Sequence, residues 1–124
     1  MVKCTSDYWE FVRQLRLDSR TIHGFIETTD INQEQQADYM SKYNDHYFIC
    51  LVDNTPAGFI GSINNDIRVC TAPEFQKMGI AKFMVDYIMD LFPTSYAKVK
   101  IDNNSSKKLF LKCGFKEKYI IYKK

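Results

Sequence analysis

The sequence has no long hydrophobic run. Its longest uninterrupted apolar stretch, Tyr47 to Val52, has six residues, whereas a helix needs about 20 to cross a bilayer. The first seven residues contain no apolar stretch of the secretory signal type. With 124 residues, 45% of them hydrophobic and 26% charged, the chain has the composition of a soluble globular protein and the length of one domain. We therefore expect one domain over residues 1–124, cytoplasmic and without a membrane partner.

Cysteine and histidine are scarce and scattered. The four cysteines (Cys4, Cys50, Cys70 and Cys113) form no Cys-x-x-Cys pair, and only two histidines are present. No zinc-type spacing occurs, so we expect no metal. Without an export signal the cysteines are expected to stay reduced, as small core residues that form no disulfide. A catalytic thiol would need an activating neighbour, and no Cys/His arrangement of that kind is recognisable.

Positive charge is concentrated towards the C-terminus. Residues 98–124 carry nine lysines against two acidic residues, a net of +7, whereas residues 1–97 carry eight basic and thirteen acidic side chains, a net of −5. One interpretation is an ordinary solvated surface on a terminal strand and helix. The other is an anion site beside the C-terminal third and a site that tolerates cations beside the rest.

The hydrophobic pattern predicts an α/β protein. Residues 18–31 are mixed and expected to be irregular, whereas 53–56 and 64–65 are typical turns. Asp45 and His46 are expected to cap the second helix. The pattern predicts helices over 7–15, 32–43, 79–92 and 103–112, and strands over 47–52, 57–63, 67–71, 96–101 and 115–122. This order predicts a sheet with mixed strand directions.

The segment 69–81 is the most informative part of the chain. A strand ends, a turn follows, and a helix opens with Gly79 in its first turn. The backbone N–H groups at a helix start have no partner within the helix, and the helix dipole is positive there. The small residues Gly79 and Ala81 let an anion approach the main chain, and Lys77 adds charge. The segment therefore predicts a pyrophosphate site, although an ordinary strand-to-helix turn would have a similar pattern.

This segment resembles motif A of the GNAT superfamily of acyl-CoA N-acyltransferases, Gln/Arg-x-x-Gly-x-Gly/Ala, with Gln76, Gly79 and Ala81 in the motif positions. A second segment, 103–115, is similar to the family's Asn-x-x-Ala/Ser-x-x-Leu-Tyr-x-Lys-x-Gly-Phe pattern. The matching residues are Asn103, Ser106, Leu109, Lys112, Gly114 and Phe115. More loosely, residues 12–20 with Ile31 and 34–39 resemble the opening of small members that acylate amino sugars on nucleotide carriers. The resemblance implies a GNAT-like mixed, mostly antiparallel central sheet flanked by about four helices.

The resemblance also implies where acetyl-CoA binds. The strand residues Val69, Cys70 and Thr71 would pair with the pantetheine, and the loop amides would hold the pyrophosphate. The remaining cofactor-binding residues would be Gln76, Lys77, Met78, Gly79, Ile80, Ala81, Lys82, Asn103, Ser106 and Phe110. Phe110 departs from the family, which often has a tyrosine there to protonate the leaving thiolate. Another group or water would then donate the proton, or catalysis would be weak. We expect the Phe110 ring to point towards the cofactor sulfur.

Two residues are candidates for the catalytic base. Asp66 begins the strand near the position where relatives often carry a base, although it also fits a simple turn residue. His23 has a suitable pKa range and lies in the irregular segment, although a lone histidine is more often a surface or packing residue. Three arginines could hold an anionic acceptor or be merely solvated, and five aromatic residues could line the cleft or the core. These residues are Arg13, Arg16 and Arg20, and Trp9, Phe25, Tyr39, Tyr43 and Tyr47.

The predicted function is acetyl transfer from acetyl-CoA to a primary amine by direct attack. Backbone N–H groups of the strand 67–71 are expected to polarise the acetyl carbonyl. The favoured acceptor is a small amine, first an amino sugar on a nucleotide carrier and second a protein or peptide amine. The alternative class is a module that binds CoA or nucleic acid without turnover, and nucleic acid is the less favoured partner. Only one strand fits after Gly114, so a partner subunit in a homodimer could complete the sheet edge.

Overall fold

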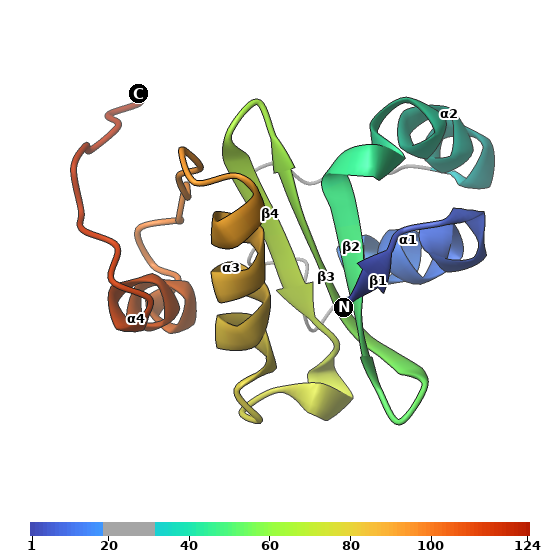
Figure 1. Cartoon of the computed structure of the whole chain (residues 1–124). Helices are drawn as coiled ribbons and strands as arrows, with labels where there is room; N and C mark the ends of the chain where they lie inside the picture. The colour runs from blue at the N-terminus through green and yellow to red at the C-terminus, as the bar shows by residue number, and fades with distance from the viewer. Residues whose placement is uncertain (19–31) are drawn as a thin grey trace.

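The computed structural model describes residues 1–18 and 32–124, which form three layers (Figure 1). The central layer is an antiparallel sheet with strands in chain order: β1 (Val2–Lys3), β2 (Tyr47–Val52), β3 (Thr55–Ile63) and β4 (Asp66–Thr71). Helices α1 (Trp9–Leu17) and α2 (Gln33–Tyr43) cover one face, and α3 (Ile80–Leu91) and α4 (Asn104–Lys112) lie on the other. The predicted fold class is confirmed. Among the described residues, no helix is long and apolar enough to cross a membrane.

Each face of the sheet has its own hydrophobic core. Phe59 of β3 packs with Val12 and Met40 on the α1/α2 face, whereas its neighbour Ile60 packs with Met84 on the α3 face. Successive side chains of a strand point to opposite faces, so a strand covered on both sides is apolar throughout. This explains why the central strands read as continuous hydrophobic runs.

The predicted caps at Asn32 and Asn103 and the turns at 53–54 and 64–65 are confirmed, whereas the first helix, predicted over 7–15, begins at Trp9 without a side-chain cap and ends at Leu17. The Asn32 side chain accepts a hydrogen bond from the backbone N–H of Gln35, whose side chain accepts one from the backbone N–H of Asn32, which starts α2. The Asn103 side chain caps α4 by accepting a hydrogen bond from the backbone N–H of Ser106 at 3.1 Å. The hairpin turns at 53–54 and 64–65 have positive φ at both residues, as two-residue hairpins of type I′ require. The expected capping of α2 by Asp45 and His46 is wrong: the C-cap residue is Asn44, and the chain continues from it into a short 3₁₀ helix, η3 (Asn44–His46).

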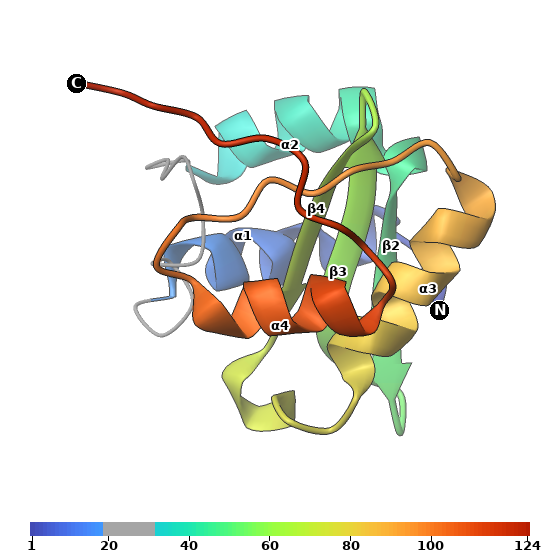
Figure 2. The same cartoon turned by 90° about the vertical axis from the view of Figure 1, so that its left-hand side faces the viewer.

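Two predicted strands, 96–101 and 115–122, do not form, and the short strand β1 was not predicted. The segment 96–101 meets the sheet only at Tyr96, which forms a parallel bridge with Asp66, and 115–122 is extended without a strand partner among the described residues. The side chains of 119–122 are between 72% and 92% exposed, and the C-terminal end projects away from the body (Figure 2). The named strands are therefore all antiparallel, and the mixed directions expected from the pattern reduce to that one bridge.

The physical reason lies in backbone pairing. Alternating apolar residues show that a segment suits a strand, but a strand forms only where a neighbouring backbone supplies hydrogen bonds. Tyr96 accepts from the N–H of Ile67 at 2.9 Å and donates to the carbonyl of Asn65 at 2.7 Å. After Tyr96 the chain leaves β4, so β4 remains the last strand of the sheet.

Candidate functional site

The outer edge of β4 is open beyond its first residues. Ile67 directs its N–H away from β3, because that N–H donates to Tyr96. Backbone direction alternates along a strand, so Val69 and Thr71 direct their N–H groups to the same outer edge. Among the described residues, no backbone group outside β3 pairs with Val69. This edge can therefore pair with an extended ligand, as expected for pantetheine at Val69, Cys70 and Thr71.

The turn between β4 and α3 presents free backbone donors. Gly79 precedes α3 with φ +79°, and Lys77 also has a positive φ of 65°. The first bond of the helix runs from the N–H of Phe83 to the carbonyl of Gly79 at 3.1 Å, so the N–H groups of Ile80, Ala81 and Lys82 have no partner within α3. No acidic residue lies in the first turn, and no side chain caps it.

Among the described residues, no atom fills the space next to Gly79. A Cβ atom built at Gly79 has no heavy-atom neighbour within 4 Å, and residues 76–79 are exposed. Unpaired N–H groups, the positive end of the dipole and open space suit a phosphate group. The residues present therefore fit the pyrophosphate of CoA, and its binding at this turn stays a prediction.

Several predicted cofactor residues also have structural contacts. The side chain of Gln76 donates to the carbonyl of Thr71 at 3.5 Å and so spans the turn, and Met78 is 60% exposed beside it. Lys82 pairs with Asp86 at 2.7 Å, and this pairing raises the pKa of Lys82, which keeps it cationic. The side chain of Ile80 is buried in the α3 core, so only its backbone faces the turn.

In α4, two predicted residues serve the helix itself. Asn103 and Ser106 form the cap described above, and Phe110 is only 8% exposed. Its ring packs edge-on against Phe115 with centroids 5.1 Å apart, within the core of the α3 face. The structure thus gives Phe110 a packing role, and its expected approach to the cofactor sulfur stays a prediction.

Asp66 lies at the end of β4 away from the phosphate turn. Cys70 packs on the α1/α2 face, and alternation places Asp66 and Arg68 on that same face. The Oδ2 atom of Asp66 pairs with Nε of Arg68 at 3.4 Å and with Nζ of Lys98 at 3.7 Å. The carboxyl is therefore held in place at the strand end, and its role as base stays a prediction. His23 lies outside the described residues.

The other candidates are mostly engaged in packing. Arg13 pairs with Glu10 at 3.1 Å, while Arg20 and Phe25 lie outside the described residues. The hydroxyls of Tyr39 and Tyr47 share a hydrogen bond of 2.8 Å, and burial raises the pKa of Tyr47. Tyr43 stacks on Tyr39. These aromatic residues belong to the core, as one of the two interpretations held.

Three of the four cysteines have a pKa shifted away from that of an activated thiolate. Burial raises the pKa of Cys4 to about 12 and also raises the pKa values of Cys50 and Cys113. A nucleophilic cysteine needs the opposite shift. Within residues 1–18 and 32–124, no group of three or more His, Cys, Asp or Glu side chains could hold a metal ion.

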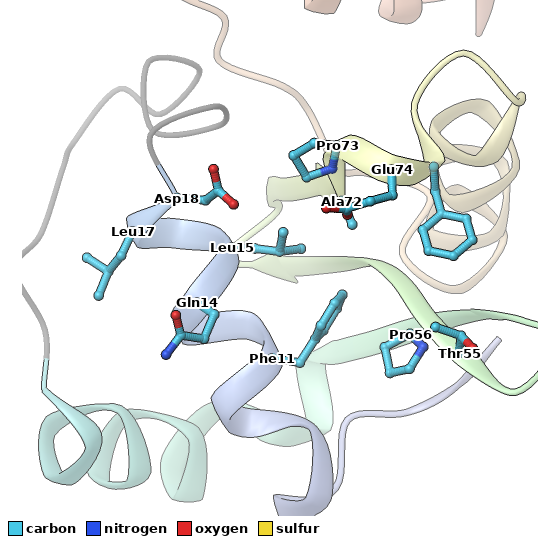
Figure 3. Close-up of a pocket in the computed structure, with 11 residues that line it drawn as sticks. Phe11, Gln14, Leu15, Leu17, Asp18, Thr55, Pro56, Ala72, Pro73 and Glu74 are labelled. Atoms are coloured by element: carbon cyan, nitrogen blue, oxygen red, sulfur yellow. The ribbon is translucent and has the colours of Figure 1, made fainter.

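A pocket of about 430 Å³ was not anticipated from the sequence (Figure 3). It lies where the C-terminal half of α1 meets the start of β3 and the 3₁₀ helix η4 (Pro73–Phe75). Its lining residues are Phe11, Gln14, Leu15, Leu17, Asp18, Thr55, Pro56, Ala72, Pro73, Glu74 and Phe75. They come from three separate segments of the chain, so no local pattern could have indicated them.

Comparison with known proteins gives one family. The model of the acetyltransferase (GNAT) family matches residues 9–115, and no curated protein sequence matches significantly. Spermidine N-acetyltransferase from Vibrio cholerae, solved with CoA and spermine, is 18% identical with a TM-score of 0.77, over 94% of this chain and 80% of that chain. The aminoglycoside N-acetyltransferase AAC(6')-Iy, solved with a CoA–acetylneamine bisubstrate analogue, is 19% identical with a TM-score of 0.66, over 96% and 92%. The ribosomal-protein-S18-alanine N-acetyltransferase from Escherichia coli is 11% identical with a TM-score of 0.68, over 94% and 77%.

Proposed function

Since the chain belongs to the acetyltransferase (GNAT) family, we propose that it transfers an acetyl group from acetyl-CoA to the primary amine of a small molecule. The observation that carries this proposal is the joint geometry of β4 and α3. The outer edge of β4 is open at Val69, and after η4 the chain reaches the start of α3. There the N–H groups of Ile80, Ala81 and Lys82 have no partner within the helix. An extended chain that ends in a pyrophosphate is the ligand that this arrangement suits.

In the proposed reaction the protein binds and orients both substrates. The helix start holds the pyrophosphate, and the outer edge of β4 aligns the pantetheine and polarises the acetyl carbonyl through backbone N–H groups. The amine nitrogen attacks the carbonyl carbon, the carbon–sulfur bond breaks, and CoA leaves as a thiolate. No covalent enzyme intermediate forms.

Two protons must move in this reaction. The attacking nitrogen gives up a proton to Asp66 or to a water molecule that reaches it. The thiolate takes a proton from solvent or from another group, because Phe110 has no hydroxyl. Asp66 lies on the α1/α2 face of β4, so we assign the approach of the amine to that face.

The acceptor is proposed from the charge around that face. The pocket beside α1 has Asp18 and Glu74 in its lining, and an acidic lining suits an uncharged or cationic amine better than an anionic one. The names of two structural relatives indicate acceptors of this kind, a polyamine and an aminoglycoside. An amino sugar on a nucleotide carrier is the other proposed acceptor. The ion pair between Arg13 and Glu10 speaks against it, because Arg13 would have to leave Glu10 to bind the phosphates of the carrier.

The test is acetylation of a panel of amines by the purified protein. Acetyl-CoA is incubated with polyamines, an aminoglycoside, a nucleotide-linked amino sugar and an N-terminal peptide, and acetylated products are measured by mass spectrometry. The proposal expects acetylation of at least one small amine. If the protein binds CoA but acetylates none of these classes, the proposal is wrong and the chain is a CoA-binding module.

That second candidate has one specific observation in its favour. Phe110 occupies the position where the family often has a tyrosine, so the usual proton donor is absent. Retention of CoA binding by a protein without turnover would support it, and detectable acetylation of any amine would exclude it.

A further inference from the structure

Helix α3 has an apolar stripe that stays partly exposed. Phe83, Tyr87 and Leu91 are spaced four residues apart, so they lie on one side of the helix and form the α3 stripe. Phe83 is 54% exposed and Leu91 is 48% exposed. Tyr87 packs edge-on against Phe48 of β2 with ring centroids 5.3 Å apart, so the stripe lies on the side of α3 that faces β2. Because the three side chains are adjacent, they form a continuous patch, and such patches mark interaction sites more often than scattered apolar residues do.

A second exposed apolar surface lies near the C-terminal end. Residues 119–122 (Tyr-Ile-Ile-Tyr) are exposed, and lysines at 116, 118, 123 and 124 flank them; we call 116–124 the lysine-flanked segment. Successive side chains of an extended chain point to opposite sides, so apolar groups lie on both sides of this segment. The two tyrosines alone expose roughly 350 Å². With the two isoleucines, the patch exceeds the few hundred Å² that a monomeric protein usually leaves in water.

The two surfaces match in length and in charge. From its first to its last residue the α3 stripe extends over about 12 Å, and the apolar part of the lysine-flanked segment spans about 10 Å when extended. The stripe is bordered by two exposed acidic residues, Asp86 and Asp90, of which Asp86 also pairs with Lys82. Opposite charges therefore border the two surfaces, which favours a contact between them.

Within one chain these surfaces lie on opposite sides of α3. Figures 1 and 2 show α4 and the C-terminal segment on one side of α3 and β2 on the other. The contact of Tyr87 with Phe48 places the stripe on the β2 side. The lysine-flanked segment of a second copy can therefore approach the stripe without crossing α3.

We propose that the protein forms a symmetric dimer in which the lysine-flanked segment of each copy packs on the α3 stripe of the other. In a two-fold dimer each contact occurs twice, so one interface covers both surfaces of both copies. The tyrosines alone, counted in both copies and on both sides of the contact, would bury roughly 1,400 Å², which is within the range of stable interfaces. The homodimer expected from the sequence is thus held at α3 rather than at a sheet edge.

Sedimentation velocity at several protein concentrations tests this dimer. We expect a reversible dimer with a Kd of about 10 μM or lower. Ile121→Asp and Phe83→Asp should each raise this Kd about tenfold or more, because a carboxylate is poorly tolerated in an apolar interface. Ile101→Asp is the matched control, since it adds the same charge at an exposed isoleucine outside both surfaces. All three positions are exposed, and urea unfolding should show that the variants remain folded.

A mixture of the two variants separates a direct contact from an indirect loss. Phe83→Asp has an intact lysine-flanked segment and Ile121→Asp has an intact α3 stripe, so one of the two contacts can form in the mixed dimer. The mixture should therefore dimerise more strongly than either variant alone. A mixture no stronger than its components, or the same Kd in both variants and in Ile101→Asp, overturns the proposal. A protein that stays monomeric at about 200 μM also overturns it, and binding to vesicles of anionic lipid would then identify a membrane surface as the partner of the segment.

Discussion

Gly79→Glu should weaken CoA binding by at least about 15-fold without unfolding the protein. The chain offers a matched control, because Gly79 and Gly114 both have positive φ, +79° and +87°, and a Cβ at either has no neighbour within 4 Å. Each substitution therefore imposes the same backbone strain, about 1–2 kcal/mol, and the same change in net charge. Only Gly79 adjoins the free N–H groups at the start of α3.

The effect on binding follows from charge and space. Two unit charges about 5 Å apart in water repel by about 0.8 kcal/mol. A pyrophosphate with about two negative charges would thus be destabilised by roughly 1.7 kcal/mol in Gly79→Glu, or about 15-fold in Kd. The new side chain also occupies the open space above the turn, so this figure is a lower bound. Gly114→Glu should bind CoA as the wild type does.

The assay is calorimetric titration of CoA at low and high salt, with urea unfolding of each variant as the measure of stability. Because salt screens charges at an exposed site, the loss in Gly79→Glu should shrink as the ionic strength rises. Both glycine variants should lose similar stability. If Gly79→Glu and Gly114→Glu bind CoA with the same affinity, the pyrophosphate does not bind at this turn.

Three further predictions concern single residues. Asp66→Asn should lower kcat about 100-fold or more in steady-state kinetics, with CoA affinity unchanged. A loss of stability alone would show that the carboxylate serves only its ion pairs with Arg68 and Lys98. Phe110→Tyr should lower the free energy of unfolding by about 1–3 kcal/mol, because its hydroxyl enters an apolar core; a rise in kcat instead would show that the ring edge reaches the cofactor sulfur. Burial raises the pKa of Cys4 to about 12 from the ordinary value of 9.0, so stability from the protonated thiol is complete below pH 9 and is lost as the pH rises towards 12. The stability difference between wild type and Cys4→Ala should therefore fall by about 1.4 kcal/mol between pH 7 and pH 10 in urea unfolding, and a constant difference would refute the shift.

Local chemistry explains which elements the sequence could predict. The caps at Asn32 and Asn103 and the positive-φ turns at 53–54 and 64–65 depend on residues within a few positions of one another. The turn around Gly79 is equally local, since both its conformation and its unpaired N–H groups follow from where the helix begins. Signals of this kind are complete in the sequence, so the turn and its unpaired N–H groups could be placed before the structure was known.

The remaining features depend on distant partners. The strand β1 has two residues and forms only because Val2 and Lys3 pair with Ile49 and Phe48. The segment 96–101 suits a strand by composition, but only Tyr96 reaches β4. The pocket beside α1 likewise needs three segments to meet. These contacts join residues that are far apart in the sequence, so the local pattern of apolar residues cannot predict them.

The positively charged C-terminal third of the chain lies on one face of the folded molecule. The lysine-rich residues 98–124, with a net charge of +7, include α4, which lies beyond α3 on the side of the phosphate turn (Figure 1). The pocket with Asp18 and Glu74 lies on the opposite face. An anionic cofactor would thus be attracted to the α3/α4 face rather than to the α1/α2 face. The open edge of β4 at Val69 is the place where both faces are within reach of one ligand chain. Because this attraction is electrostatic, added salt should weaken CoA binding, whereas equal CoA affinity at low and high salt would show that the lysines are merely solvated.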